Sequence, residues 1–509
     1  MKLIGDLLFD NPRIDPSRPA IFWDEGVWPY AELLDRVSRV AAALKREGIS
    51  RGDRVSVLMG NEPEYLVSYF AITSIGAIYV PLNWRLLPAE HVNLMSNAGV
   101  KALITSSEFN ATINLARSGV ATLSRVVVAG EQGGDLPRFD EWSAQPAGPP
   151  TCDGLSPDDI AAIVYTSGTT SLPKGACLTH GNVVVDLEHI ALYAHPANTD
   201  TVLQVTPLYH QTIVHSLVHL AHGAAVRLLR RFSAEAVLKA ISDNAINYVF
   251  LAPTMLYELL DCPNRSQYQL SSLKTIVYGA APVTGARLKE AIVVFGQVLV
   301  HGYGLTEATS HCASLDRAEH LVAEGSVGRG TPGVEVRIVD DRGNACVPGQ
   351  IGEIIVRGPT VMKGYWGDAE KTAETITNGW LHSGDLARKD ERGYIYIVDR
   401  KKDLVISGGA NIYPSDIEEV FAKHPAIAEV AAFGVPDDYW GEALTVAVVP
   451  RPNRKLNSDE LIAFAKQHLG GYQVPKRLEI LNELPRNPSG KILKRVLREK
   501  FAPPSTKAT

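Results

Sequence analysis

Between residues 165 and 175 the sequence reads Tyr165-Thr-Ser-Gly-Thr-Thr-Ser-Leu-Pro-Lys-Gly175, directly after the apolar run Ile160-Ala-Ala-Ile-Val164. The apolar run has the pattern of a buried strand. The stretch after it combines glycines, through which a backbone can approach a ligand, with hydroxyl donors and the point charge of a lysine. We therefore expect a loop that wraps a polyphosphate, formed by Thr166, Ser167, Gly168, Thr169, Thr170 and Lys174.

This loop differs from the common P-loop, in which Gly-Lys-Ser/Thr opens a helix. Here Pro173 precedes Lys174 and Gly175 follows it, which predicts that the lysine lies on a flexible flap. Taken alone, the stretch also fits a solvated surface loop rich in Ser, Thr and Gly.

The first 325 residues alternate apolar strands with helices. The segment 30–47 places its apolar residues on one helical face, and Asn61 is expected to cap a second helix. Strands are expected at 54–59, 76–81, 102–105, 160–164, 201–205, 248–251, 275–277 and 298–300. This alternation predicts an α/β fold with a largely parallel sheet flanked by helices, and ligands at the carboxyl ends of the strands.

The alternation of strands and helices ends after residue 325. Short β-rich runs separated by Gly, Pro and Asp predict a small antiparallel barrel or sandwich over about 326–399. An α+β segment follows over 400–509. The charged junction Asp399-Arg-Lys-Lys-Asp403 is the expected hinge between an N-terminal domain, 1–399, and a mobile C-terminal domain, 400–509. A tight polar turn within one domain is the alternative.

Length and composition narrow the class of protein. A chain of 509 residues is too long for one core. Its net charge of −6 gives no attraction to nucleic acid or to an anionic membrane. The five cysteines are widely spaced, which indicates neither a zinc site nor a disulfide framework. Without a signal peptide or a long apolar segment, we expect a cytoplasmic enzyme with reduced thiols.

Several further motifs line up with the loop at 165–175. They are Thr206-Pro-Leu-Tyr-His210, Tyr278-Gly-Ala-Ala-Pro282, Gly302-Tyr-Gly-Leu-Thr-Glu307, Gly379-Trp-Leu-His-Ser-Gly-Asp385, Ser407-Gly-Gly-Ala-Asn-Ile-Tyr-Pro414 and Pro485-Arg-Asn-Pro-Ser-Gly-Lys-Ile-Leu-Lys494. In this order, and over essentially the whole chain, the sequence resembles the adenylate-forming superfamily of acyl-CoA synthetases, adenylation domains and luciferases. The resemblance implies an acid–CoA ligase that forms an acyl-adenylate and pyrophosphate from ATP, then transfers the acyl group to CoA.

The resemblance also assigns nucleotide-binding residues. Attack on the α-phosphorus builds negative charge, which calls for cations and donors. Lys174 and the 166–170 loop suit the β- and γ-phosphates, Thr306 the α-phosphate, and Glu307 the Mg²⁺ ion, which needs few protein carboxylates. Asp385 and Arg400 are expected at the ribose. The adenine slot is expected to be formed by Gly279, Ala280, Ala281 and Tyr303. Taken singly, Glu307 and Asp385 also fit a helix-start acid and a turn acid.

By the same resemblance, Lys491 bridges the substrate carboxylate and the α-phosphate during adenylation. The C-terminal domain then rotates about Lys402 and presents a new face for CoA. The residues expected to meet CoA are Gly408, Gly409, Trp440, Lys476 and Arg477. His210 is expected near the acyl carboxylate as a gate or orienting group, with a buried structural histidine as the alternative.

The acyl pocket is expected to consist of Tyr209, His210, Gln211, Thr212, His215, Tyr278, Gly279, His301, Gly302, Ala308 and Ser310. We expect Gly302 to keep the back of this pocket open, and the polar members to suit an aryl or arylpropenoic acid. A medium-chain fatty acid is the rival substrate.

Two residues depart from the usual family form: Ser171 replaces a glycine, and Ala410 replaces a glutamate. Because Ala410 lies on the expected pantetheine side, transfer to a carrier protein or to an amine is an alternative to CoA. A homodimer is a separate alternative to a monomer. A nucleotide-binding protein without catalysis is disfavoured by the presence of Lys174, Glu307, Asp385 and Lys491 together.

Overall fold

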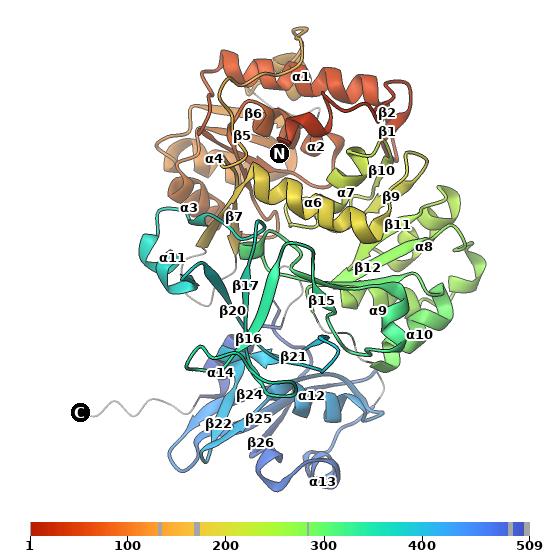
Figure 1. The fold of residues 1–509 in the computed structure, drawn as a ribbon, viewed down its shortest axis with the longest axis vertical. Helices are drawn as coiled ribbons and strands as arrows, with labels where there is room; N and C mark the ends of the chain where they lie inside the picture. The colour runs from red at the N-terminus through yellow and green to blue at the C-terminus, as the bar shows by residue number, and fades with distance from the viewer. Residues whose placement is uncertain are drawn as a thin grey trace. The chain divides into compact units, whose positions relative to one another are not determined.

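The computed structural model describes residues 2–130, 135–166, 174–281, 283, 285–452, 454–486 and 492–502. The chain forms two compact units, Met1–Val336 with Val356–Leu381 and Arg337–Ile355 with His382–Thr509 (Figure 1). Residues 382–399 thus group with the second unit, whereas the sequence placed them before the boundary at 400. A movement about the 399–403 junction stays a prediction.

The first unit contains a nine-stranded sheet in the order β15-β14-β13-β12-β11-β9-β10-β1-β2. Its six central strands are parallel, and β2, β14 and β15 are antiparallel at the edges. The strands are β1 (Pro19–Trp23), β2 (Gly26–Pro29), β9 (Thr201–Gln204), β10 (Ala225–Leu228), β11 (Tyr248–Leu251), β12 (Thr275–Gly279), β13 (Leu299–Tyr303), β14 (Ala313–Leu315) and β15 (Arg329–Gly330).

A seven-stranded sheet, in the order β18-β8-β7-β4-β3-β5-β6, forms a second layer of this unit. Five strands are parallel, while β8 runs antiparallel to β7 and β18 antiparallel to β8. The strands are β3 (Arg54–Leu58), β4 (Ile78–Pro81), β5 (Ala102–Ser106), β6 (Arg125–Ala129), β7 (Ile160–Thr166), β8 (Lys174–Thr179) and β18 (Gly364–Tyr365).

Helices cover both sheets, and the largest apolar cluster joins side chains of the two sheets to those of α1, α2 and α6. α2 is buried almost all round, as expected of a helix held between layers. Figure 1 shows α8, α9 and α10 beside β11 and β12, where a second apolar cluster lies. The helices of this unit are α1 (Tyr30–Arg46), α2 (Pro63–Ser74), α3 (Pro88–Ala98), α4 (Asn110–Gly119), α5 (Phe139–Trp142), α6 (His180–Ala194), α7 (Ile213–Leu220), α8 (Ala234–Asp243), α9 (Pro253–Asp261), α10 (Gly285–Phe295) and α11 (Ala369–Thr375).

The β-rich region forms a small sheet in the order β16-β17-β20-β19, with β21 paired to β20. The chain passes from one unit to the other within β16, β17 and β20. The strands are β16 (Glu335–Val339), β17 (Gly352–Arg357), β19 (Ile376–Thr377), β20 (Trp380–Lys389) and β21 (Ile395–Arg400). The second unit continues with the short 3₁₀ helix η6 (Lys401–Asp403) at the expected hinge.

The rest of the second unit is α+β, as predicted. Its sheet has the order β23-β22-β25-β24, with β26 paired to β25. The elements are β22 (Val405–Ser407), β23 (Ala410–Ile412), α12 (Pro414–Ala422), β24 (Ile427–Asp437), β25 (Gly441–Pro450), α13 (Ser458–His468), β26 (Arg477–Ile480) and α14 (Lys494–Phe501). The expected fold class, layered α/β sheets with a small β-rich part and an α+β C-terminal part, is confirmed.

Two local expectations were wrong. Lys174 does not lie on a flap: it opens β8 and pairs with Thr166 of β7, because the chain returns as an antiparallel strand. Asn61 does not cap α2, whose N-cap is Glu62. Instead the Asn61 amide donates to the Thr206 and Leu229 carbonyls, at 3.1 and 3.0 Å.

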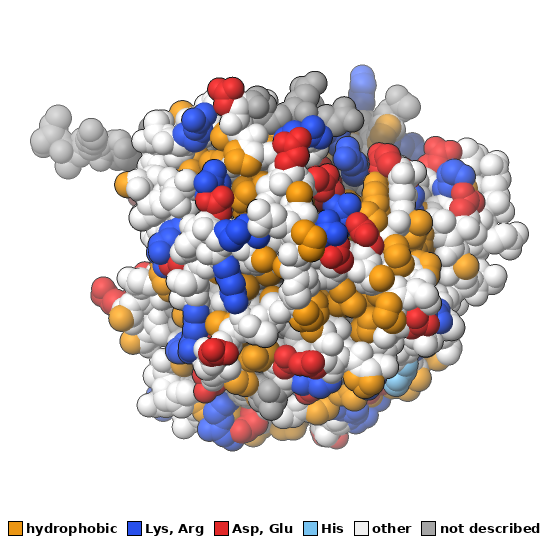
Figure 2. Space-filling model, turned by 90° about the horizontal axis from the view of Figure 1, so that it is seen from above, with side chains coloured by type: hydrophobic (Ala, Val, Ile, Leu, Met, Phe, Trp, Pro, Cys, Tyr) orange, Lys and Arg blue, Asp and Glu red, His pale blue; other side chains and the backbone are white. Residues whose placement is uncertain are grey.

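The mixed charge of the surface and the reduced state of the cysteines agree with what the composition predicted. The face of the molecule in Figure 2 carries Lys and Arg side chains interspersed with Asp and Glu. All five cysteines lie in the described part of the chain, and all are free thiols. Among the described residues, no helix has the length and apolar character needed to cross a membrane.

Candidate functional site

The carboxyl ends of β12 and β13 bring four predicted residues side by side. Tyr278 is the register partner of His301, and Gly279 that of Gly302. A Cβ atom on Gly279 would lie 2.3 Å from the Gly302 carbonyl oxygen, so only glycine allows the two backbones this approach. Carboxyl ends of parallel strands are where ligands bind in such sheets.

The turn after β13 carries Thr306, Glu307 and Ala308 in the short 3₁₀ helix η4 (Thr306–Ala308). Thr309 follows with a φ of 65°, an unusual value for a β-branched residue. Two hydrogen bonds hold it there: Gln211 Nε2 donates to the Thr309 carbonyl at 2.5 Å, and Thr309 Oγ1 donates to the Thr360 carbonyl at 2.7 Å. The segment after β9, which carries Gln211, therefore meets the turn after β13.

Lys174 and Glu307 approach each other through Tyr365, a residue that the sequence analysis missed. The Tyr365 hydroxyl donates to Glu307 Oε1 at 2.8 Å, and Lys174 Nζ lies 5.3 Å from the centre of the Tyr365 ring. Burial and the Glu307 charge raise the pKa of Tyr365, which keeps its hydroxyl proton available for that hydrogen bond. A cation and a carboxylate, both expected at the phosphates, thus share one partner.

His210 lies in the segment after β9, which Asn61 fixes. Asn61 Oδ1 accepts from the Leu208 amide at 3.0 Å, besides the two bonds described above. The His210 ring packs against that of Tyr209, with ring centres 4.3 Å apart. Burial, with a smaller contribution from Arg85, lowers the pKa of His210 to about 4, so its imidazole is neutral at pH 7.

The expected acyl residues form a set of mostly buried polar and aromatic side chains. The rings of Tyr278 and His301 meet edge to face, with centres 4.7 Å apart. His215, on α7, is 1% exposed and stacks on Phe250. Thr212 Oγ1 accepts from Thr206 Oγ1 at 3.0 Å. Tyr209 and Ala308 are also buried.

The sequence analysis expected Gly302 to keep the back of the acyl pocket open, but the structure shows that the space beside this glycine is occupied. A Cβ atom on Gly302 would lie 2.6 Å from His311 Nε2. The space beside the glycine is thus already filled by an imidazole, and the neighbouring Ser310 hydroxyl is hydrogen-bonded to His311 Nδ1 at 2.7 Å. His311 is a further residue that the sequence analysis missed.

In the second unit, Asp385 and Arg400 face each other across β20 and β21. Arg400 Nε lies 2.6 Å from Asp385 Oδ1, and Asp385 is only 5% exposed. The carboxylate oxygens of Asp385, held in place by the arginine, can accept further hydrogen bonds from hydroxyl groups. Lys402 follows in η6, where burial lowers its pKa.

The residues expected at CoA also gather within the second unit. The Gly408 amide donates to the Trp440 carbonyl at 2.8 Å, and Lys476 Nζ lies 4.7 Å from the centre of the Trp440 ring. Gly409 has a φ of 80°, which favours glycine. Arg477 follows Lys476 and lies 3.7 Å from Asp437.

Other predicted residues lie outside the described part of the chain. They are Ser167, Gly168, Thr169, Thr170, Ser171 and Lys491. Four others are described: Ala280 and Ala281 follow β12, Tyr303 is the last residue of β13, and Thr306 opens η4. Ala280 has a φ of 67°, which marks a tight turn after β12.

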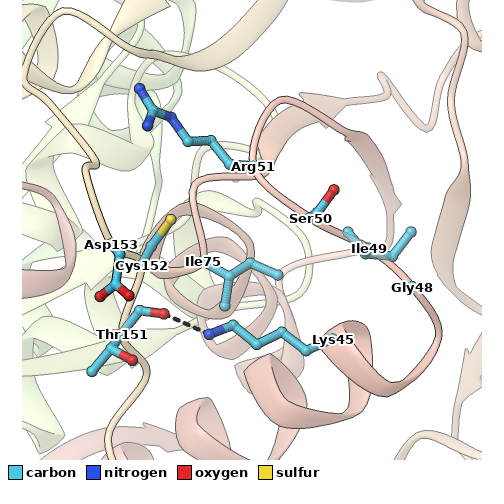
Figure 3. Close-up of a pocket in the computed structure, with 9 residues that line it drawn as sticks. All are labelled: Lys45, Gly48, Ile49, Ser50, Arg51, Ile75, Thr151, Cys152 and Asp153. Carbon is cyan, nitrogen blue, oxygen red and sulfur yellow. Dashed lines mark hydrogen bonds between the residues drawn. The ribbon is translucent and has the colours of Figure 1, made fainter.

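Two cavities in the described part of the chain contain no predicted site residue in their walls. One, of about 370 Å³, includes Lys45, Arg51 and Cys152 in its wall, and Lys45 Nζ donates to the Thr151 carbonyl at 2.5 Å (Figure 3). The other, of about 600 Å³, includes Trp23, Glu62 and Arg230. The chemical motifs, and not these cavities, define the candidate site.

Two family models match the chain. The AMP-binding enzyme model matches residues 8–366, and the AMP-binding enzyme C-terminal domain model matches residues 416–491. The chain belongs to the AMP-binding enzyme family. The first model spans Lys174, His210 and Glu307, and the second begins a few residues after Gly408 and Gly409. The resemblance to adenylate-forming enzymes is thereby confirmed.

Relatives of this AMP-binding enzyme match over nearly their full length. A feruloyl-CoA synthase from Amycolatopsis sp is 39% identical, over 98% of this chain and 99% of the relative. An indoleacetate–CoA ligase from Aromatoleum aromaticum is 35% identical, over 96% of each chain. The amide bond synthetase McbA from Marinactinospora thermotolerans has a similar structure, with a TM-score of 0.89 and 30% identity over 98% of this chain and 99% of McbA.

The donor set of this AMP-binding enzyme fits Mg²⁺. Among the described residues, no group of three or more His, Cys, Asp and Glu side chains could hold a metal ion. Mg²⁺ does not need such a group, because it is usually bound by one or two carboxylates together with phosphate oxygens and water. Glu307, whose Oε1 accepts from the Tyr365 hydroxyl, would supply a hard oxygen ligand of that kind.

Proposed function

We propose that the protein is an AMP-forming acid–CoA ligase whose acid is an aryl or arylpropenoic acid. The enzyme class and its use of ATP, Mg²⁺ and CoA agree with the family and with two relatives, one named a feruloyl-CoA synthase and one named an indoleacetate–CoA ligase. The acid is inferred from one observation: aromatic and imidazole side chains, above all the edge-to-face pair of Tyr278 and His301, stand at the ends of β12 and β13. Such walls suit a flat ring better than an alkyl chain.

In this proposal the described residues bind and orient the reactants. Lys174 and Thr166 hold the β- and γ-phosphates, and Thr306 the α-phosphate. Asp385 accepts from the ribose hydroxyls while Arg400 keeps its carboxylate in place. Glu307 holds Mg²⁺, which when bound would neutralise charge on the phosphates.

The adenine ring is assigned to Gly279, Ala280, Ala281 and Tyr303. His210, neutral at pH 7, orients the acid carboxylate without adding a charge beside it. Lys491 is assigned to the carboxylate and α-phosphate during adenylation.

The second half-reaction is assigned to the C-terminal part of the chain. We infer that it rotates about Lys402, withdraws Lys491 and presents Gly408 and Gly409 to the pantetheine arm. Trp440, with Lys476 already over its ring, would stack on the CoA adenine, and Lys476 and Arg477 would meet its phosphates. A cytoplasmic location suits the five free thiols. Whether the protein forms a homodimer is a separate question, which the molar mass in solution would decide.

Transfer to an amine is the second candidate function. It is favoured by the structural similarity to an amide bond synthetase and by Ala410, which begins β23 where the family usually has a glutamate. A medium-chain fatty acid is the rival substrate.

The test is a panel of carboxylic acids scored for pyrophosphate release, repeated with CoA and then with amines. Aryl acids should lead the panel, and CoA should be consumed in proportion to AMP formed. Amide formation without CoA consumption would select the second candidate, and a preference for alkyl acids would refute the aryl assignment.

A further inference from the structure

The short strand β18 ties together two segments that the proposed function assigns to the phosphates and to Mg²⁺. On one side of Tyr365, the Trp366 amide donates to the Gly175 carbonyl of β8 at 2.7 Å. On the other side, the Met362 amide donates to the Glu307 carbonyl of η4 at 2.8 Å. The backbone of Tyr365 is therefore held between β8 and η4.

Helix α11 fixes the same tyrosine from a third direction. The Tyr365 amide donates to Thr372 Oγ1 at 2.8 Å. A Cβ atom on Gly364 would lie 2.8 Å from Thr372 Cγ2, so β18 packs directly against this helix. Tyr365 is only 8% exposed. The fold thus sets the position of the tyrosine without a ligand, as a preorganised site requires.

Tyr365 contacts two opposite charges with different parts of its side chain. Its hydroxyl donates to Glu307 Oε1 at 2.8 Å, and the centre of its ring lies 5.3 Å from Lys174 Nζ. A hydroxyl donor suits a carboxylate, and the face of an aromatic ring attracts an ammonium group. In both contacts the partner of the charge is a neutral group, so neither charge is cancelled.

A direct ion pair between Lys174 and Glu307 would work against ligand binding. Opposite charges attract strongly in a partly buried place, where water screens them less. ATP would then have to break the pair before the lysine could meet a phosphate. If the lysine were paired in about nine molecules out of ten, ATP would bind roughly 10-fold more weakly.

We propose that Tyr365 is a positioning residue that keeps Lys174 and Glu307 apart, so that the lysine stays available to the phosphates and the carboxylate to Mg²⁺. The proposal rests on the proposed function, which assigns those two roles. It predicts that the two parts of the tyrosine act separately. The hydroxyl orients the carboxylate and governs the effect of Mg²⁺, whereas the ring separates the charges and governs the binding of ATP itself.

The test measures ATP binding by calorimetry, without acid or CoA, so that no turnover occurs. Each protein is titrated once in EDTA and once in excess Mg²⁺. Tyr365→Phe keeps the ring and removes the hydroxyl. Its affinity for ATP in EDTA should stay close to that of the native protein, while the strengthening of ATP binding by Mg²⁺ should fall roughly 3- to 10-fold.

Tyr365→Leu also removes the ring, so that Lys174 and Glu307 can pair. Its affinity for ATP in EDTA should fall roughly 10-fold. Adding Glu307→Gln removes the partner of the lysine. This second change should strengthen ATP binding severalfold more in Tyr365→Leu than in the native background, because only there does it release the lysine. An equal effect in both backgrounds would overturn the separating role of the ring.

Tyr165→Phe is the matched control. It removes a hydroxyl from the neighbouring strand β7, where that group donates to Asn97 Oδ1 at 2.6 Å, and it should leave both affinities as they are in the native protein. Folding is checked by circular dichroism. If Tyr365→Leu fails to fold, Tyr365→Phe carries the test.

The results separate this proposal from the proposed function. Native affinities in Tyr365→Phe, or an equal loss in EDTA and in Mg²⁺, would overturn the proposal and leave Tyr365 as a packing residue, even if the native protein releases pyrophosphate. A loss confined to the effect of Mg²⁺, without pyrophosphate release from any acid, would support the proposal and refute the ligase. A native protein that binds no ATP would contradict both.

Discussion

Replacing Gly302 by alanine should destabilise the first unit because the new methyl group would overlap His311. The Cβ atom would lie 2.6 Å from Nε2 and 2.7 Å from Cδ2 of the imidazole. Carbon contacts are normally about 3.5–4.0 Å, so the ring must retreat by roughly 1 Å. It cannot do so freely, since Tyr193, Ser310 and Asp186 all hold it.

Overpacking of this kind costs about 1–3 kcal/mol in unfolding free energy. The assay is urea unfolding, followed by tyrosine and tryptophan fluorescence. Gly148→Ala is the matched control, because a Cβ atom there meets nothing within 4 Å. In a His311→Ala background, which removes the obstructing ring, Gly302→Ala should cost much less than it does alone.

The same contact changes what larger substitutions at this position should do to activity. Gly302→Ile should lower kcat/KM for large and small acids alike, because it displaces His311 and does not merely shorten an open cavity. A Gly302→Ala variant as stable as Gly148→Ala, within about 0.5 kcal/mol, would refute the packing argument. So would a loss of activity confined to bulky acids.

Three further predictions follow from the site and its surroundings. Lys491→Ala should abolish acyl-adenylate formation, seen as loss of pyrophosphate release, yet spare thioester formation from a supplied adenylate; equal loss in both half-reactions would contradict its role. Lys402→Pro should do the reverse, because proline fixes φ and blocks rotation at a hinge; native rates in both steps would make 399–403 a rigid turn. Burial lowers the pKa of His219 to about 4 and that of His301 to about 3, from 6.5. The unfolded chain therefore binds more protons in this window, and the unfolding free energy should fall as pH drops from 6.5 towards 4, by up to about 1.4 kcal/mol per pH unit for each histidine; a flat urea midpoint over that range would argue against buried neutral histidines.

The sequence predicted those parts of the fold that depend on local pattern. The bounds of α1 were expected to within one residue, because its apolar spacing and its end residues are contained in the segment itself. The ends of β12 and β13 were expected to carry the site, because glycine-rich turns follow apolar runs there. In these cases neighbours in the chain decide the structure.

What escaped prediction depends on contacts between segments far apart in the chain. Lys174 lies on a strand because β8 pairs with β7, and Asn61 serves the 206–208 segment instead of its own helix. Tyr365 reaches Glu307 across 58 positions, and Tyr193 reaches His311 across 118. Asp186 is a charged residue among apolar residues of α6, but nothing in its own segment indicates that it accepts from the His311 amide.

The central claim, activation of an acid on the α-phosphate of ATP, is tested most directly by isotope transfer. The protein is incubated with 4-hydroxycinnamate carrying ¹⁸O in its carboxylate, ATP, Mg²⁺ and CoA, and the products are analysed by mass spectrometry. Attack of the carboxylate on the α-phosphorus predicts one ¹⁸O atom in AMP, unlabelled pyrophosphate, and a thioester that retains the other ¹⁸O. Label in inorganic phosphate with formation of ADP, or thioester formation with unlabelled AMP, would contradict the account.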